Sequence, residues 1–372
     1  METTVFRGRC AQIQRMLAEQ ELEAALITDP VNLYYLTGWR TNPHERFTGL
    51  LIPQEGPPAF VVPALDVEAA GTGWVRDINA WSDAENPYEI LAAVARRLGT
   101  GGGRLGVEKA AISLATYEGV ATALIPAETR DVRPLLNSLR VIKDEGEMET
   151  LQRAADIACE AFESACRDIR PGMSEKKVAR LLDRAIESLG GDGPSFETTV
   201  LCGPRTALPH ARPGDDVIQS SGLVLMDFGA AYRGYMSDIT RTFCIGSWPR
   251  DLAAVYDAVL AAHDAAIESV RPGASMADVD RAARNVIEER GFGPYFIHRT
   301  GHGLGLAIHE EPYFVEGNQQ RLVPGMVGTI EPGIYLPGTG GVRIEDDVAV
   351  TPTGCRMLTR LPASRRDLPI EY

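Results

Sequence analysis

The stretch RPGMS at residues 170–174 recurs as RPGAS at residues 271–275, and this repeat decides the fold of the second part of the chain. The same offset brings Gly190 onto Gly291. Each copy is predicted to contain a helix that stops at Pro-Gly, a serine that caps a second helix, and a glycine-rich turn. We therefore expect residues 145–372 to be an internal duplication that packs with pseudo-twofold symmetry.

Both copies then continue into a strand that ends in a carboxylate. The apolar run at residues 223–226 leads into Asp227, and Glu331 follows the corresponding run of the second copy. A second carboxylate lies on the next predicted strand of each copy, Asp238 in the first and Glu345 in the second. Burial of an ionised carboxylate without a partner is unfavourable. Because the symmetry would bring all four together, the sequence predicts a centre of concentrated negative charge.

Such a centre needs positive charge, and the predicted strands contain only two basic residues, Arg241 and Arg343. Strand alternation puts Arg343 on the same face as Glu345 and turns Arg241 away from Asp238. One arginine cannot neutralise four carboxylates, whereas two divalent cations can. The pattern therefore predicts a site for two metal ions.

Three of the six histidines lie close together, in HRTGHGLGLAIHEEP at residues 298–312. A single histidine beside an apolar run is usually a structural hydrogen-bonding group, but His298, His302 and His309 accompany the duplicated carboxylates. A set rich in oxygen ligands with one imidazole suits manganese, cobalt or zinc. Such ions lower the pKa of a coordinated water, which is the chemistry of a hydrolase.

These segments resemble the pita-bread metallopeptidases, the family of methionine aminopeptidase, aminopeptidase P and prolidase, with creatinase as a relative without metal. The similar segments are LMDFGAAYRGYMSDITRTF at 225–243, HRTGHGLGLAIHEEP at 298–312, TIEPGIY at 329–335, GVRIEDDV at 341–348 and, in the first domain, NLYYLTGW at 32–39. The resemblance covers essentially the whole chain. It implies an α+β architecture, with a smaller α/β domain of the creatinase type over residues 1–135 and a duplicated pita-bread catalytic domain over residues 136–372.

The resemblance also implies a dinuclear metal site. Its ligands would be Asp227, Asp238, His302, Glu331 and Glu345, with Asp238 and Glu345 bridging both ions. Glu331 would carry a proton to the leaving nitrogen. Manganese is the first expectation for the metal, with cobalt or zinc as alternatives. Because all five ligand positions are filled, a metal-free role or a binding protein without catalysis is disfavoured.

Further roles around this site follow from the same resemblance. His210, in GPRTALPHARPGD at residues 203–215, and His309 would face the substrate, where a histidine helps to stabilise the oxyanion. His298 would lie close by, and Arg343 would brace the bridging carboxylates. For each of these four residues the alternative is a structural hydrogen bond or salt bridge.

The two-domain form favours hydrolysis of an Xaa-Pro bond at the amino-terminus of a peptide. Some prolidase-like members carry an arginine four residues after the histidine that matches His309, where it can grip the carboxylate of a dipeptide, but this chain has Tyr313 there. That departure supports the alternative of an aminopeptidase P acting on longer peptides, whereas the short chain favours an Xaa-Pro dipeptidase. A non-peptidase hydrolase or lyase on the same scaffold is a third alternative, because a fold does not fix a function.

Composition limits the partners and the location. The net charge of −14 argues against a nucleic-acid partner, which would bind clusters of Lys and Arg. No apolar run approaches the length of a membrane span, and the amino-terminal stretch lacks the apolar core of a signal peptide. The six cysteines are spread without a CxxC pair, which favours a reducing compartment. We expect a cytoplasmic enzyme for proline-containing di- or oligopeptides, and the resemblance implies a homodimer. The remaining histidines, His44 and His263, are predicted to be surface residues.

Overall fold

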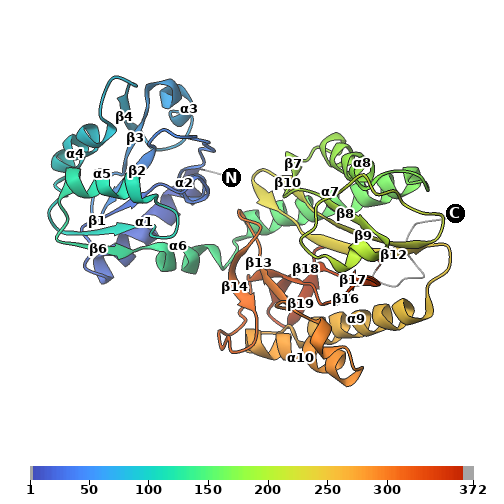
Figure 1. The fold of residues 1–372 in the computed structure, drawn as a ribbon. Helices are drawn as coiled ribbons and strands as arrows, with labels where there is room; N and C mark the ends of the chain where they lie inside the picture. Colours follow the sequence, from blue (N-terminus) through green and yellow to red (C-terminus); the bar gives the residue numbers. More distant parts are fainter. Residues whose placement is uncertain (1–2, 363–372) are drawn as a thin grey trace. The chain divides into compact units, whose positions relative to one another are not determined.

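The computed structural model describes residues 3–362 and consists of two compact units (Figure 1). The division falls between Arg140 and Val141. Within residues 3–362, every helix is too short or too polar to serve as a membrane span. The α+β architecture predicted from the sequence is confirmed, and its site-bearing part is the second unit.

The first unit is built on a six-stranded sheet in the order β4-β3-β2-β1-β5-β6. The pairs β1/β5, β5/β6 and β3/β4 are parallel, whereas β2 runs antiparallel to both β1 and β3. Its elements are α1 (Thr3–Glu19), β1 (Ala24–Ile27), α2 (Pro30–Thr37), β2 (Gly49–Pro53), β3 (Ala59–Pro63), α3 (Val67–Ala70), β4 (Asp77–Trp81), α4 (Pro87–Leu98), β5 (Arg104–Val107), α5 (Leu114–Leu124), β6 (Glu128–Asp131) and α6 (Arg133–Arg140).

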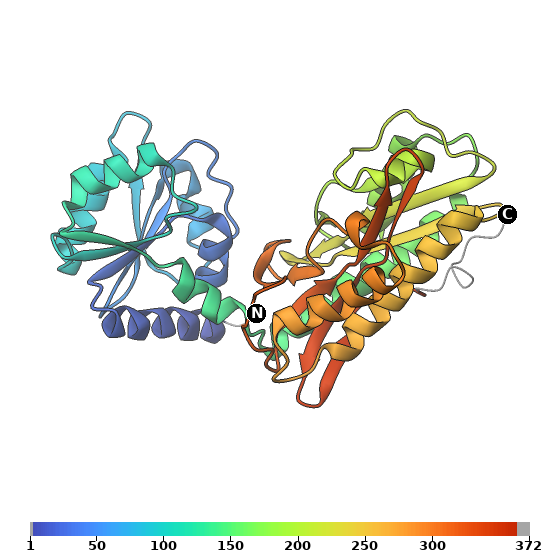
Figure 2. The same cartoon turned by 60° about the horizontal axis from the view of Figure 1, so that its bottom comes forward.

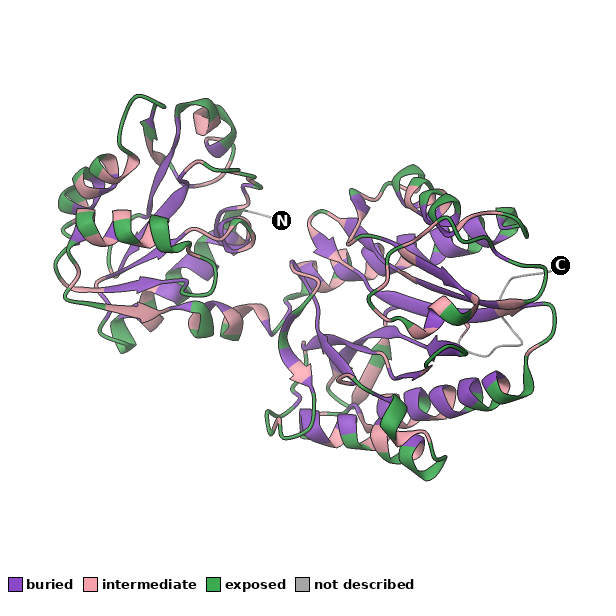
Figure 3. Ribbon diagram, in the orientation of Figure 1, coloured by how far each residue is buried: buried purple, intermediate pink, exposed green. Residues whose placement is uncertain are grey.

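Helices cover both faces of this sheet, because its inner strands β1, β2 and β3 are buried along their whole length. Strand residues Ala24 and Leu26 pack with Leu91 and Val94 of α4 in one core cluster. Their neighbours along the strand point to the opposite face. In Figure 2, α1 (dark blue) lies on that other side of the sheet from α4 and α5. Figure 3 shows the resulting pattern of helices buried toward the sheet and exposed outward.

The second unit carries the duplication. Its elements are α7 (Glu145–Asp168), α8 (Glu175–Ser188), β7 (Gly193–Pro194), β8 (Thr199–Cys202), β9 (Gly222–Phe228), β10 (Ala230–Tyr232), β11 (Tyr235–Met236), β12 (Ile239–Ile245), α9 (Arg250–Ser269), α10 (Met276–Glu289), β13 (Gly301–Gly303), β14 (Glu310–Phe314), β15 (Val327–Ile330), β16 (Gly333–Leu336), β17 (Gly340–Arg343), β18 (Asp346–Thr351) and β19 (Gly354–Met357). Short 3₁₀ turns precede β9 (Gly203–Ala207) and β13 (Gly293–Tyr295).

The two predicted caps of the repeat are present. The side chain of Ser174 accepts a hydrogen bond from the backbone N–H of Lys177 at the start of α8. The side chain of Ser275 accepts one from Asp278 at the start of α10. Figure 1 shows α7 and α8 on one half of the unit and the pair α9 and α10, side by side, on the other.

The sheets of the two halves meet at one place. The first half has the sheet β12-β9-β8 and the second the sheet β14-β13-β15-β18-β19. An antiparallel bridge joins Thr240 of β12 to Glu345, and the backbone N–H of Glu345 donates to Thr240 O at 3.1 Å. The backbone N–H of Arg343 donates to Thr242 Oγ1, also at 3.1 Å. The junction between the halves therefore runs through one of the predicted metal ligands.

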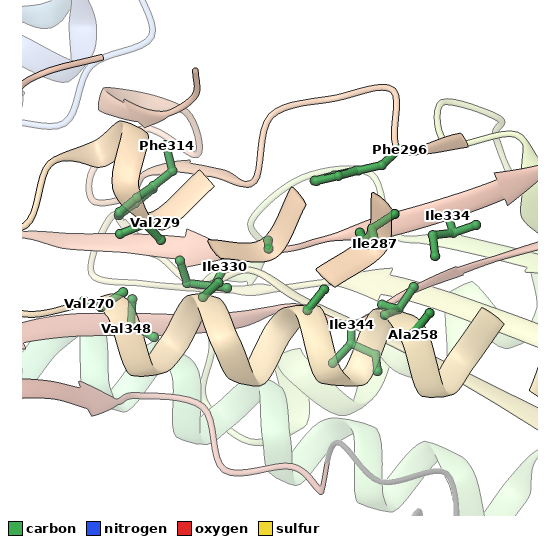
Figure 4. Packing of buried hydrophobic residues seen from close by; sticks show 14 of the residues in the cluster. Ala258, Val270, Val279, Ile287, Phe296, Phe314, Ile330, Ile334, Ile344 and Val348 are labelled. Carbon is green, nitrogen blue, oxygen red and sulfur yellow. The ribbon is translucent and has the colours of Figure 1, made fainter. Parts of the chain in front are cut away.

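A large apolar core supports this junction from the side of α9 and α10. Figure 4 shows Ala258 of α9 and Val270, which follows α9, packed with Ile330, Ile344 and Val348. Ile330 directly precedes Glu331, and Ile344 directly precedes Glu345. Because these isoleucines are fully buried, the adjacent carboxylates are held on a rigid backbone.

Candidate metal centre

The four predicted carboxylates occupy equivalent places in the two halves. Asp227 lies near the end of β9 and Glu331 directly follows β15, whereas Asp238 directly precedes β12 and Glu345 directly precedes β18. β9 pairs with β12, and β15 pairs with β18, both antiparallel. In an antiparallel pair the end of one strand lies beside the start of the other. Each half therefore brings its two carboxylates to the same edge, as the duplication predicts.

A tight turn returns the chain between the first two carboxylates. The β10–β11 hairpin turns at Arg233 and Gly234, which both have positive φ, at 48° and 81°. Gly229 lies where the two strands approach most closely, since a Cβ there would come within 1.8 Å of Ser237 O. Only glycine fits this approach, which holds Asp227 and Asp238 together.

Three of the predicted ligands converge on one point. Ligand-type atoms of Asp238, His302 and Glu345 lie within 4.8 Å of one another, and all three residues are buried. His302 Nε2 lies 3.5 Å from Asp238 Oδ2 and 3.4 Å from Glu331 Oε1. The fifth residue, Asp227, opens onto the same cavity.

The imidazole of His302 is oriented for a metal ion. Its Nδ1 lies 3.0 Å from Gly303 O. Because a carbonyl oxygen only accepts, Nδ1 carries the hydrogen and the lone pair of Nε2 faces the carboxylates. Burial lowers the pKa of His302 to about 3, so that the ring is neutral at physiological pH. A neutral ring with a free Nε2 lone pair is the form that binds metal.

The carboxylates lack enough positive charge. Burial, and then the charge of Glu345, raise the pKa of Asp238 well above its ordinary value. Burial, and then the charge of Glu331, do the same for the pKa of Glu345. Burial also raises the pKa of Glu331 to about 7. Four carboxyl groups that are hard to ionise and one neutral imidazole are ligands suited to divalent cations. The positive charge of such cations would balance the negative charge of the carboxylates.

Arg343 provides the nearest positive charge and is held by a chain of hydrogen bonds. Its Nη2 donates to Asp227 Oδ2, and its Nε lies 4.0 Å from Glu345 Oε2. Its Nη1 donates to the hydroxyl of Tyr335 at 3.0 Å, and that hydroxyl lies 3.0 Å from His298 Nε2. His298 Nδ1 lies 2.7 Å from a backbone carbonyl, so Nδ1 donates and Nε2 accepts from Tyr335. Both nitrogens of His298 are therefore engaged.

A second buried network lies behind the centre and corrects one prediction. His263 is not a surface residue, because its exposed fraction is 3% and its Nε2 lies 3.0 Å from Asp346 Oδ2. The buried Arg241 donates to Asp346 Oδ1 at 2.7 Å and to Glu345 O at 2.6 Å. The burial of His263 could have been predicted from the sequence, because it lies at helical spacing from the other buried residues of α9. His44 is exposed, as predicted.

A cavity of roughly 620 Å³ opens onto the centre. All the predicted site residues except Tyr313 line it. The rings of His302 and His309 meet edge-on with centroids 4.3 Å apart, and His210 reaches the cavity from the loop after the 3₁₀ turn at Gly203–Ala207. A cavity of this size accommodates a small peptide.

Tyr313 does not line the cavity, but its ring lies beneath Arg299, a cavity residue that the sequence did not single out. Tyr313 pairs with His302 across strands β13 and β14. The guanidinium of Arg299 lies over its ring, with Cζ 4.3 Å from the centroid, and Arg299 lines the cavity. Tyr335 is the other contributor that the sequence did not mark, because nothing in TIEPGIY shows where its hydroxyl points.

Buried carboxylates around a neutral imidazole, open to a cavity, form the site of a metal-dependent hydrolase. Residues 149–352 match the model of metallopeptidase family M24, and residues 9–142 match the creatinase/prolidase N-terminal domain. The chain belongs to metallopeptidase family M24 and is a peptidase with two-domain, creatinase-like architecture. Membership of this family implies divalent metal ions and a peptide substrate.

Relatives and solved structures match along nearly the whole chain. The YkvY protein of Bacillus subtilis (strain 168) is 41% identical over 356 residues, which are 95% of this chain and 98% of that protein. The structure of dipeptidase PepE from Mycobacterium ulcerans matches with a TM-score of 0.90 at 35% identity, covering 98% of both chains. Recombinant prolidase from Thermococcus sibiricus matches with a TM-score of 0.91 at 36% identity, covering 97% of both chains.

Proposed function

We propose that this peptidase is an Xaa-Pro dipeptidase that uses two divalent metal ions, with manganese as the first candidate and cobalt or zinc as alternatives. The observation that carries the proposal is the convergence of Asp238, His302 and Glu345, whose ligand-type atoms lie within 4.8 Å of one another beside the cavity. Similarity to a dipeptidase and to a prolidase supports the choice of an Xaa-Pro dipeptide as the substrate.

Five residues would hold the ions, namely Asp227, Asp238, His302, Glu331 and Glu345. When bound, the ions lower the pKa of a coordinated water and polarise the peptide carbonyl. The protein contributes the fixed position of each donor atom. Glu345 Oε2, for example, accepts a hydrogen bond from Thr240 Oγ1 at 2.6 Å, across the junction of the halves.

Glu331 is the proposed proton carrier. In the metal-free protein burial raises its pKa to about 7, so that this carboxyl group holds a proton more readily than an exposed one. A carboxyl group placed beside the reacting water can act as a general acid–base. In this role Glu331 takes a proton from the attacking water and delivers it to the nitrogen of the leaving proline. Its position beside His302, with a 3.4 Å separation of Oε1 and Nε2, supports the assignment.

The histidines divide into two roles in this proposal. Burial, and then the charge of Arg299, lower the pKa of His309, so that its neutral ring can donate a hydrogen bond to the peptide carbonyl. His210 lines the same cavity and is the second such donor. His298 acts differently, because both its nitrogens are engaged, and it positions Arg343 through Tyr335. Cytoplasmic location and a homodimer stay predictions from the sequence.

The test is hydrolysis of Ala-Pro, Ala-Pro-Ala and Ala-Ala by the full chain, treated with chelator and then supplied with manganese. Cleavage of Ala-Pro above the other two is expected, with none before manganese is added. Glu331→Gln should lower kcat on Ala-Pro by ~10²–10⁴-fold, the usual effect of removing a general acid–base group. Glu316→Gln, at an exposed position, is the matched control and should leave kcat unchanged.

Other outcomes assign other functions. Preference for Ala-Pro-Ala would make the protein an aminopeptidase P. If the protein binds manganese but cleaves none of the three peptides, the proline-directed proposal is wrong and the scaffold serves another substrate.

A further inference from the structure

One guanidinium of the cavity has no acidic partner among the residues that the structure describes. Three arginines line the cavity. Arg343 is committed to Asp227, and Nε of Arg212 pairs with Glu197 Oε2 at 3.1 Å. The guanidinium of Arg299 has no hydrogen-bond acceptor among residues 3–362, and its interaction there is with the ring of Tyr313.

The position of Arg299 is fixed from both sides. Directly opposed residues of an antiparallel pair point to the same face of the sheet, so the Tyr313 ring lies on the face of its partner His302. Arg299 Cζ lies 4.3 Å from the centroid of that ring. On its other side, the backbone carbonyl of Arg299 accepts a hydrogen bond from His298 Nδ1 at 2.7 Å. A guanidinium stacked on an aromatic ring loses less side-chain entropy when it binds a ligand.

The charge of this guanidinium reaches the reacting part of the cavity. Arg299 lines the same cavity as His309 and Glu331. A half-buried cation that has no acidic partner within residues 3–362 and lines the same cavity as the proposed proton carrier can bind an anionic group of the substrate.

We propose that Arg299, supported by Tyr313, binds the terminal carboxylate of a dipeptide and thereby selects dipeptides over longer peptides. The inference rests on the proposed Xaa-Pro dipeptidase function. An Xaa-Pro dipeptide ends in a carboxylate one residue beyond the scissile bond, and a carboxylate matches the fork of a guanidinium. A tripeptide presents a neutral amide at that place, which leaves the desolvated guanidinium without its charged partner.

The experiment compares Ala-Pro with Ala-Pro-amide, which differ only in the terminal charge, on the manganese-loaded full chain. The wild-type protein should prefer Ala-Pro. Arg299→Gln should lower kcat/KM for Ala-Pro by ~10–100-fold, mostly through KM, because a charge-assisted hydrogen bond is lost. It should change kcat/KM for the amide little, so that the amide also reports that the variant is folded. Arg299→Lys keeps the positive charge but not the two parallel N–H donors of a guanidinium. Its kcat/KM for Ala-Pro should lie between the values of the wild type and of Arg299→Gln.

Two further variants separate the roles. Tyr313→Phe keeps the ring and should behave like the wild type on both substrates, whereas Tyr313→Ala should lose part of the preference for Ala-Pro. Arg212→Gln removes a cavity guanidinium that is already paired, and it should keep the preference.

Several results would overturn the inference. Equal losses on Ala-Pro and Ala-Pro-amide in Arg299→Gln would show that Arg299 supports the site without contacting the carboxylate. Loss of the preference in Arg212→Gln would assign the carboxylate to the other arginine. If the wild-type protein cleaves the amide as well as the acid, only the role of Arg299 fails. If it cleaves neither substrate, the proposed function fails and the role of Arg299 fails with it.

Discussion

At the scale of single residues, the guanidinium of Arg343 connects the carboxylates of the centre to the wall of the cavity. It donates to Asp227 on one side and to the Tyr335 hydroxyl on the other, at 3.0 Å in the second case. The Tyr335 hydroxyl in turn donates to His298. Arg343 is buried, so each of these acceptors replaces water that the guanidinium has lost.

Tyr335→Phe removes one of these acceptors and leaves a buried N–H without a partner, at a cost of about 1–3 kcal/mol. We expect kcat/KM on Ala-Pro to fall by roughly tenfold as Arg343 shifts, together with a lower melting temperature. Tyr117→Phe is the control, because its hydroxyl donates to Thr129 Oγ1 at 3.2 Å in the first unit. Full activity in Tyr335→Phe would mean that the hydroxyl does not position Arg343.

In the first unit, Glu108 makes stability depend on pH. Burial raises its pKa to about 7, against the effect of backbone N–H groups of Thr28 and Asp29 that donate to it at 2.7 and 2.9 Å. The unfolded value is about 4.3, so the folded unit holds this proton more tightly. Its contribution to stability is fully present below about pH 4 and is lost as pH rises through about 7.

Melting temperatures of the first unit, measured from about pH 4 to pH 8, should therefore fall with a slope that Glu108→Gln reduces. The loss amounts to at most about 4 kcal/mol for one group. Glu118→Gln, at an exposed position on α5, should keep the wild-type slope. Identical slopes in all three proteins would show that Glu108 is ionised throughout this range.

At the scale of elements, the hairpin between β9 and β12 brings two carboxylates together through one close backbone contact. The contact depends on Gly229, where a Cβ would come within 1.8 Å of Ser237 O. The strands cannot separate freely, because β9 is also paired with β8 on its other side. The close approach of Gly229 to Ser237 therefore controls the distance between the candidate ligands Asp227 and Asp238.

Gly229→Ala should destabilise the second unit by about 3 kcal/mol or more and weaken binding of manganese, since the overlap forces Asp227 and Asp238 apart. Calorimetry and metal titration measure both effects. Gly8→Ala is the contrasting change, because Gly8 lies in helix α1 with nothing within 4 Å of an added Cβ, and it should stabilise by up to about 1 kcal/mol. Normal metal binding by Gly229→Ala would contradict the role of this contact.

Prediction from sequence succeeded where a local pattern repeats and failed where a contact depends on tertiary register. The duplicated caps and strand ends were readable, and with them the equivalent places of the four carboxylates. The stacking of Arg299 on Tyr313 was not, because it depends on the pairing of β13 and β14, which shifts by a bulge after His302. No periodicity of the sequence shows such a shift. His263 was missed although its helical spacing with buried residues was present.

At the scale of the whole molecule, the negative charge concentrated in the second unit couples metal binding to pH. In metal-free protein, carboxyl groups with raised pKa values, such as Glu331 at about 7, contribute stability that is present at low pH and lost as pH rises. We expect bound cations to reverse this trend, because they would replace the protons on the same oxygens.

The increase in melting temperature on adding manganese should therefore grow from about pH 5 to pH 8, and it should appear in the transition of the second unit. Scanning calorimetry with chelator and with manganese measures the difference. Asp238→Asn should abolish most of it, since that side chain is one of the three that converge. An increase of the same size at every pH would indicate that these carboxyl groups are already ionised in the metal-free protein.

The bridge between Thr240 and Glu345 also affects how the protein folds while it is being synthesised. A ribosome releases the chain from its amino-terminus, so the first half of the duplication emerges and begins to fold while Glu345 is still being synthesised. Until that residue leaves the ribosome, Thr240 is paired only with Asp227 of β9, and Asp227 and Asp238 are without their counterparts from the second half. We therefore expect the complete set of candidate metal ligands to assemble only after the last strands have been translated.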